Sequence, residues 1–221
     1  MRDVPAPRDQ ATDRLRLAQW LSPAFPIGGF AYSQGLEAAM AGGDVRCAAT
    51  LAAWVAAVIE TGSARTDAIL LAHARAAGSD LDALDALARA LAPSAERLTE
   101  TLEQGAAFGA MMAAMDGTPP PPALPYPLAV GLAARPLALD TAEVVALWLH
   151  GQAALLVSAG VRFIPLGQGA GQAILAALAP RLAALAGTLA AAPLDAIATG
   201  TPRADLMAMA HETLTVRLYR S

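Results

Sequence analysis

The chain has 221 residues, a net charge of −4 at pH 7, 56% hydrophobic residues and only 15% charged residues. This length can bury a substantial core in one domain, or in two small ones at most. The acidic balance argues against nucleic acid as a partner, because nucleic acid requires a basic surface. The apolar excess fits either a membrane protein or a protein that buries extra surface against partners.

The sequence disfavours a membrane protein. The longest charge-free apolar run, residues 144–161, has 18 residues and is just long enough to span a bilayer. It contains His150, Gly151 and Gln152, and much of the remainder is alanine. Residues 1–16 carry several charges and lack an apolar core, so they do not form a signal peptide. We therefore expect a cytosolic protein in which residues 1–12 are disordered.

Residue usage excludes several kinds of chemistry. All 15 basic residues are arginine, so the chain has neither the lysine of a Walker phosphate loop nor a lysine for Schiff-base chemistry. Cys47 is the single cysteine, which excludes an internal disulfide and a metal–thiolate cluster. His73, His150 and His211 lie in separate segments without the spacing of a metal site. We expect no active site, metal or cofactor.

Apolar residues recur at helical spacing along most of the chain. The clearest pattern is in Cys47–Thr61, where Leu51, Trp54, Val55 and Val58 share one face. We predict an all-α fold, a single-domain bundle over residues 13–212 with about ten helices. These are Arg14–Leu21, Phe30–Met40, Cys47–Thr61, Arg65–Ala76, Asp80–Leu91, Ser94–Met115, Tyr126–Ala134, a longer helix that Asp140 caps, Gln172–Gly187 and Arg203–Glu212.

Local signals add detail to the long helices. Ser94 fits a helix N-cap, and Asp140 with Glu143 fits a capping box. Gly105 and Gly109, four residues apart, would let another helix approach closely. Residues 117–124 contain four consecutive prolines and cannot be helical, so we predict an exposed connector inside the domain.

Residues 161–172 combine a short β-like run, a glycine-rich loop and a helix, as a nucleotide-binding unit does. The glycine spacing is GxGxG, no further strands form a βαβ unit and the lysine is missing. This segment is better interpreted as a tight turn between two packed helices.

Residues 22–37 are dense in proline, glycine and bulky apolar side chains. One interpretation is a loop between helices that folds back on the core. The other is a rigid loop that presents Ser33, Gln34 and Glu37 to a partner. The residues alone favour neither.

The C-terminal tail, residues 213–221, differs from everything before it. Apolar and polar residues alternate along it with period 2, which is typical of a half-buried strand, although a helical protein offers such a strand no sheet. Chain ends are usually frayed, but a disordered tail is normally poor in Leu, Val and Tyr. The tail is therefore either frayed or reserved for the surface of another protein.

Four segments resemble the UreF family of urease accessory proteins: LSPAFPIGGFAYSQGLE (Leu21–Glu37), Ser63–Asp67, SAGVRFIPLGQGAGQ (Ser158–Gln172) and HETLTVRLYRS (His211–Ser221). Their order and spacing cover nearly the whole chain. The resemblance implies an all-α cytosolic urease maturation factor without catalysis or a tightly bound metal. It also implies a homodimer that bridges UreD (UreH in some species) and the GTPase UreG, so that nickel reaches apo-urease.

The resemblance also implies where partners bind. It places Leu21–Glu37 near UreG and Arg217–Ser221 against UreD. We predict that Glu37→Ala leaves the fold intact and weakens UreG recruitment, and that deletion of Arg217–Ser221 abolishes UreD binding. The expected partner-binding residues are Ser33, Gln34, Glu37, His211, Glu212, Arg217, Leu218, Tyr219, Arg220 and Ser221.

The chain departs from the family pattern at two places. Charged residues at the start of the long middle helix are rearranged over Glu96–Glu100, and Ala106 follows Gly105, so the sequence assigns them no role. The Pro119–Pro122 run is the second departure. An alternative function is that of a GTPase-activating protein or fidelity regulator of UreG, with an arginine finger supplied to the GTPase.

Overall fold

The computed structural model describes residues 9–198 and 200–221. The all-α prediction is confirmed, because the described residues form ten α-helices and two 3-10 turns but no strand. The elements are α1 (Gln10–Trp20), η1 (Gly29–Ala31), α2 (Leu36–Ala41), α3 (Ala48–Thr61), α4 (Ser63–Arg75), α5 (Leu81–Ala90), α6 (Ala95–Asp116), α7 (Tyr126–Ala133), α8 (Thr141–Phe163), α9 (Gln168–Ala190), η2 (Leu194–Ala196) and α10 (Pro202–His211).

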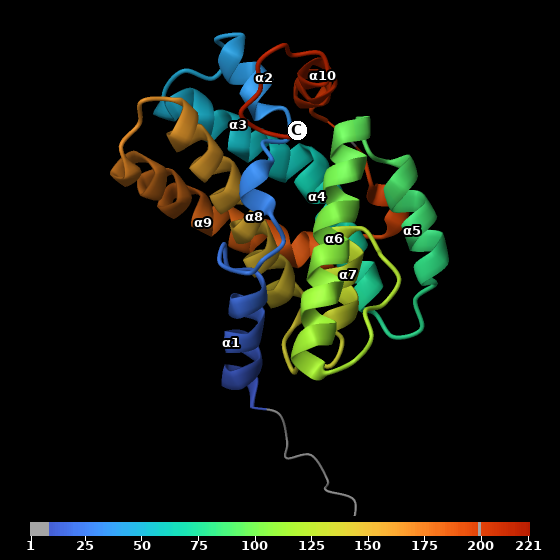
Figure 1. The fold of residues 1–221 in the computed structure, drawn as a ribbon. Coiled ribbons are helices and arrows are strands. Elements are labelled where there is room, and N and C mark those ends of the chain that lie inside the picture. Colours follow the sequence, from blue (N-terminus) through green and yellow to red (C-terminus); the bar gives the residue numbers. More distant parts are fainter. Residues whose placement is uncertain (1–8, 199) are drawn as a thin grey trace, which may run out of the picture.

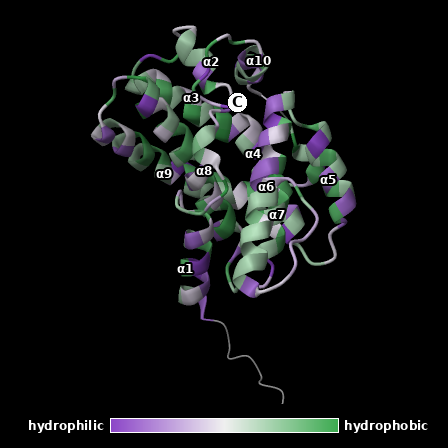
Figure 2. Ribbon diagram, viewed as in Figure 1, coloured by the Kyte–Doolittle hydropathy of each residue, from purple (hydrophilic) through white to green (hydrophobic). Residues whose placement is uncertain are grey.

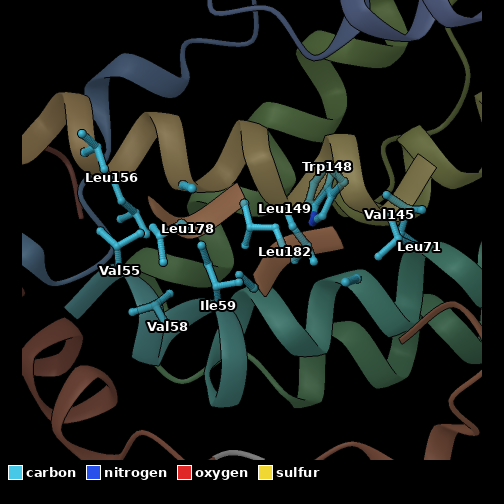
Figure 3. Packing of buried hydrophobic residues seen from close by; sticks show 14 of the residues in the cluster. Val55, Val58, Ile59, Leu71, Val145, Trp148, Leu149, Leu156, Leu178 and Leu182 are labelled. Atoms are coloured by element: carbon cyan, nitrogen blue, oxygen red, sulfur yellow. The ribbon is translucent and has the colours of Figure 1, made fainter. Parts of the chain in front are cut away.

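Helix α8 runs through the middle of the fold, with α9 alongside it and α3 and α4 against it (Figure 1). Its side chains Val145, Trp148, Leu149 and Leu156 meet apolar residues of these neighbours in the core (Figure 3). Trp148 is 1% exposed and Leu149 is fully buried. The longer helix predicted after Asp140 is therefore the central buried helix of the fold.

Both α8 and α9 are long and apolar enough to cross a membrane by length and composition. In α8, 56% of the most apolar window is already buried inside the protein, as in the core helix of a soluble domain. In α9 the corresponding share is 33%.

Hydrophilic residues gather on α1 and on the end of α6 beside the C-terminus (Figure 2).

Several predicted helix starts differ from the structure, those of α1, α2 and α9 by four residues or more. Helix α1 begins at Gln10, where Asp9 caps it through the N–H of Ala11, so residues 10–12 are helical rather than disordered. The rest of the predicted disordered segment, residues 1–8, lies outside the described residues. The helix predicted to begin at Phe30 begins only at Leu36, because Gln34 and Gly35 adopt left-handed φ angles of 56° and 79° that interrupt a helix.

The turn between α8 and α9 is short, as the second interpretation of residues 161–172 expected. The β-like run Val161–Phe163 is the last turn of α8, and α9 begins at Gln168. Pro180 lies inside α9 without ending it.

The capping and glycine predictions have mixed outcomes. Ser94 caps α6 by accepting the N–H of Arg97 at 3.1 Å, as predicted. Asp140 makes no capping bond with its side chain, and Glu143 instead pairs with Arg14 across to α1. At Gly105 an added Cβ would overlap the carbonyl oxygen of Leu124, at the end of the proline-rich connector, and would lie 2.9 Å from the nitrogen of Tyr126, the first residue of α7.

Candidate partner-docking site at the C-terminal tail

The tail (residues 213–221) turns back from α10 and ends between α2 and the start of α6 (Figure 1). The N–H of Arg220 donates to the carbonyl of Ala31 at 2.8 Å, and the N–H of Ser33 donates to the carbonyl of Ser221 at 2.9 Å. No strand forms among the described residues, so the predicted strand is wrong. The tail is not frayed either, because these hydrogen bonds hold it in place. It packs on the segment before α2 instead.

Glu37 is the main anchor of the tail. Its carboxylate is 2% exposed and accepts the N–H of Leu218 at 2.7 Å and that of Tyr219 at 2.9 Å. His211 Nε2 lies 2.9 Å from the same carboxylate. Burial acts to raise the pKa of Glu37, but these hydrogen bonds outweigh it and hold the pKa below its ordinary value.

His211 joins two helices to this anchor. It is fully buried at the end of α10, and its Nδ1 lies 2.6 Å from Glu96 of α6. Arg217 binds the other oxygen of Glu96 at 2.6 Å. We call Glu37, His211 and Glu96 the carboxylate clasp. It connects α2, α6 and α10 and fixes the position of the tail.

Gly35 permits this arrangement by bringing α10 close to the start of α2. A Cβ at Gly35 would lie 2.6 Å from the backbone nitrogen of Ala208, which is too close for any side chain. Its φ of 79° is also in the region that favours glycine. Glycine at this position therefore lets His211 reach Glu37.

Glu212, the residue after His211, acts on α6 rather than on the tail. Its carboxylate accepts the N–H of Ala95 at 2.8 Å and that of Glu96 at 3.3 Å. Because these are unpaired donors of the first turn of α6, Glu212 adds a second cap to that of Ser94. The end of α10 is thus fastened to the start of α6.

The last residues of the tail contact two further groups. Tyr219 is 7% exposed, donates its hydroxyl to the carbonyl of Ala159 at 3.1 Å, and lies under the Arg162 guanidinium. Arg220 binds Glu103 at 2.9 Å and covers the ring of Tyr32. In each case an arginine guanidinium lies over a tyrosine ring, and these two cation–π contacts help to orient the tail.

Ser221 is enclosed by polar side chains. Its hydroxyl donates to Glu100 of α6 at 2.8 Å, and its carbonyl also accepts the hydroxyl of Ser33. Gln34 donates to the same Glu100 at 3.1 Å. Arg97 lies 3.4 Å from Glu100 and 2.7 Å from Asp67, and both Arg97 and Glu100 are buried.

The structure brings the predicted residues of two distant segments together, although with inward-facing side chains. Ser33 and Glu37 are buried and Gln34 is half-buried, so the expectation that they are presented outward is not met. Their groups hold the tail instead. The loop folds back on the protein, as the first interpretation of residues 22–37 proposed.

Two apolar side chains of the tail are exposed beside its polar ones. Val216 is 80% and Leu218 is 73% exposed, whereas Tyr219 is buried. Phe30, on the loop beside the tail, is 69% exposed. Two side chains of α10, Leu206 and Met209, are also exposed. Burial alternates only over residues 218–221, and Val216 and Leu218, which the pattern would bury, face solvent.

The contribution of α6 was not predicted from the sequence. Glu96, Glu100 and Glu103 each bind the tail or His211, although no role was predicted for these charged residues. They are spaced at i, i+4 and i+7, which places them on one face of a helix. The signal available in the sequence was this acidic helix face together with a tail that carries two arginines, a pair of segments with opposite charge. Among the described residues, no group of three His, Cys, Asp or Glu could hold a metal ion.

Comparison with known proteins identifies the family. The UreF family profile matches residues 45–179, and a protein of Cereibacter sphaeroides named urease accessory protein UreF is 59% identical over 94% of this chain and 98% of its own length. The chain belongs to the UreF family of urease accessory proteins. Proteins of the same name from Paracoccus denitrificans and Dinoroseobacter shibae are 51% and 50% identical over 94% of the chain. The resemblance seen in the sequence is thereby confirmed.

Proposed function

We propose that this UreF-family chain works in the cytoplasm as a bridge between UreD (UreH) and the GTPase UreG, so that nickel is delivered to apo-urease. In this role it performs no reaction itself. The observation that carries the proposal is the exposure of Val216 and Leu218 on a tail that Glu37 and its neighbours hold in place. A fixed apolar surface binds a partner without the entropy cost of ordering the tail on contact.

UreD is the partner proposed for this tail surface. Val216 and Leu218 provide the apolar contact, and exposed Arg217 and Arg220 flank it. Exposed apolar side chains close together mark a protein interaction site more often than single ones do. Leu206 and Met209 on α10 would extend the same surface.

For UreG we propose the outer side of the Leu21–Glu37 segment. Phe30 is its exposed apolar side chain, while Ser33, Gln34 and Glu37 support the segment from inside. The revised role for Glu37 is to shape this surface rather than to touch the partner. Because Glu37 also holds the tail, the proposed UreG and UreD surfaces share one buried carboxylate.

We further propose a homodimer, as the family resemblance implied. The outer side of α9 exposes small apolar side chains that a second copy would cover: Ala173, Ala176, Ala177, Ala184 and Gly187. Sedimentation of the purified chain tests this part separately from partner binding.

The test of the bridge uses the double variant Val216→Asp, Leu218→Asp and co-purification with UreD. We expect UreD binding to fall at least about tenfold. Helicity should be unchanged, and the free energy of unfolding should stay within about 0.5 kcal/mol of that of the original chain, since both residues are exposed. Leu15→Asp is the matched control, because Leu15 is 72% exposed but lies on α1. Equal UreD binding by the double variant and the control would remove the docking role of the tail.

Kinetics distinguish the proposed bridge from the alternative function, an activator of the UreG GTPase. An arginine finger raises GTPase turnover by orders of magnitude. UreG turnover measured with and without this chain is expected to change much less than that if the chain acts as a bridge.

A further inference from the structure

The buried imidazole of His211 faces a carboxylate on both sides. Nε2 lies 2.9 Å from Glu37 and Nδ1 lies 2.6 Å from Glu96. An ionised carboxylate only accepts hydrogen bonds, and a neutral imidazole has one N–H and one bare nitrogen. Both contacts are hydrogen bonds only when the ring is a doubly protonated imidazolium, or when one of the two acids carries the extra proton. The carboxylate clasp therefore contains one proton more than a neutral histidine and two carboxylates.

The charges around His211 support the same proton count. Glu37 faces it from α2, Glu96 from α6, and Arg217 of the tail faces the second oxygen of Glu96. Glu212 is turned toward the first N–H groups of α6. With the extra proton, two carboxylates are balanced by two cations. Without it, a net negative charge remains at a buried site, which is unfavourable.

The clasp is connected directly to the tail. The Glu37 oxygen that faces His211 also accepts the N–H of Tyr219, and its other oxygen accepts the N–H of Leu218. When the ring loses its proton, one lone pair of His211 must face a carboxylate oxygen. Repulsion there displaces Glu37 or His211, and the tail amides lose their acceptor.

We infer that the proton held among Glu37, His211 and Glu96 is a switch that keeps the tail closed, and that its loss as the pH rises releases the tail. The functional consequence rests on the proposed docking role of the tail. A closed tail presents Val216 and Leu218 in a fixed position, so affinity for UreD falls when the clasp opens.

The pH dependence has two limits. Rising pH removes the proton from the imidazole and opens the clasp. Strongly falling pH protonates Glu37, whose pKa is held low by its hydrogen bonds, and this removes the acceptor of the two tail amides. The tail is therefore most firmly held at intermediate pH.

The switch is tested by NMR on the full chain between about pH 5 and pH 9, a window that contains the range in which histidines change charge. The ring nitrogen signals of His211 report its protonation. Amide exchange of Leu218 and Tyr219, corrected for the intrinsic effect of pH, reports closure of the tail. We expect protection of both amides to fall at least about tenfold together with deprotonation of His211. Protection that stays constant while the ring titrates would overturn the inference.

Three variants sharpen the test. His211→Gln should leave the tail weakly protected at every pH, whereas His150→Gln, at an exposed histidine, should keep the transition unchanged. Arg217→Gln removes one positive charge near the imidazolium while sparing the ring contacts, so the transition should move to higher pH. This third variant tests the switch even if His211→Gln does not fold. An unmoved transition in Arg217→Gln would contradict the proposed charge balance.

Failure of the switch and failure of the docking role are distinguishable. Exchange is measured without UreD, so it tests the clasp alone. If the tail opens with pH but UreD binding does not follow, the clasp stands and the docking proposal fails. If the tail does not open, the switch fails, and the Val216→Asp, Leu218→Asp experiment still decides the docking role.

Discussion

His211 and Glu37 are 174 residues apart in sequence and 2.9 Å apart in space. This pair joins the end of α10 to the start of α2, and both residues lie in segments that carry the resemblance to UreF proteins. The tail that follows His211 is held by the same carboxylate. One buried pair therefore contacts both segments for which partner binding is proposed.

Replacement of Glu37 by alanine is expected to destabilise the protein, contrary to the expectation from sequence. The change leaves the N–H groups of Leu218 and Tyr219 and the ring of His211 without their acceptor. Loss of one partner from a buried charged cluster costs about 3–5 kcal/mol. Urea unfolding, together with exchange of the two tail amides, measures the effect.

Glu37→Gln serves as the control for this change. It keeps the size of the side chain and one acceptor oxygen, so its loss of stability should be smaller than that of Glu37→Ala. Stability of Glu37→Ala equal to that of the unchanged chain would show that the carboxylate does not hold the tail.

Gly35→Ala is expected to separate α2 from α10. The new Cβ would lie 2.6 Å from the nitrogen of Ala208, and the residue would also have to adopt a φ of 79°. Gly43 has the same φ of 79° with nothing within 4 Å of an added Cβ, so Gly43→Ala isolates the cost of the backbone angle. That cost is about 1 kcal/mol.

We expect Gly35→Ala to lose clearly more stability than Gly43→Ala and to expose the amides of the tail, which Gly43→Ala should leave protected. Thermal unfolding and amide exchange measure the two effects. Equal losses in the two variants would mean that α10 does not depend on close approach at Gly35.

Arg97→Leu is expected to cost about 3–5 kcal/mol in free energy of unfolding, because it leaves Asp67 and Glu100 buried without their cation. The matched control is Arg89→Leu, which removes an exposed pair with Asp85 on α5 and should cost less than about 1 kcal/mol. Chemical denaturation of both variants makes the comparison. Similar losses would show that the buried cluster does not stabilise α6 against α4.

Asp67 gives a prediction about pH. Burial raises its pKa to about 6 from an ordinary 3.8, against the opposing effect of Arg97. Folding thus favours the protonated form of Asp67. The resulting contribution to the free energy of unfolding is fully present below pH 3.8 and is lost as the pH rises through about 6.

Asp67→Asn does not titrate and lacks this contribution. The stability of the original chain relative to Asp67→Asn should therefore rise by about 2–3 kcal/mol between pH 7 and pH 4. Denaturation of both proteins at the two pH values gives the difference. A difference that is constant with pH would contradict the raised pKa.

Helices were predictable from sequence because their apolar faces repeat locally. Periodicity located α3, α6 and α8 to within a few residues, and Ser94 marked the start of α6 correctly. The tail was not predictable in this way. Its alternation suggested a strand, but its N–H groups bind the side chain of Glu37 about 180 residues earlier, a contact that no local pattern encodes.

The same reason explains why the burial of Glu37 was not predicted. Its place in a conspicuous loop suggested a partner contact, whereas three donors brought in by the tail and α10 make it a buried acceptor. Glu96 and Glu100 also acquire their roles only when α6, α10 and the tail meet. Local sequence could locate the segments of the site, but not the direction in which their side chains point.

The most direct test of the bridge is recovery of UreD with tagged UreG in the presence and absence of this chain. We expect UreD to be recovered only when the chain is present, and to be lost with the Val216→Asp, Leu218→Asp variant while that variant itself remains bound to UreG. Equal recovery of UreD without the chain would contradict the central claim.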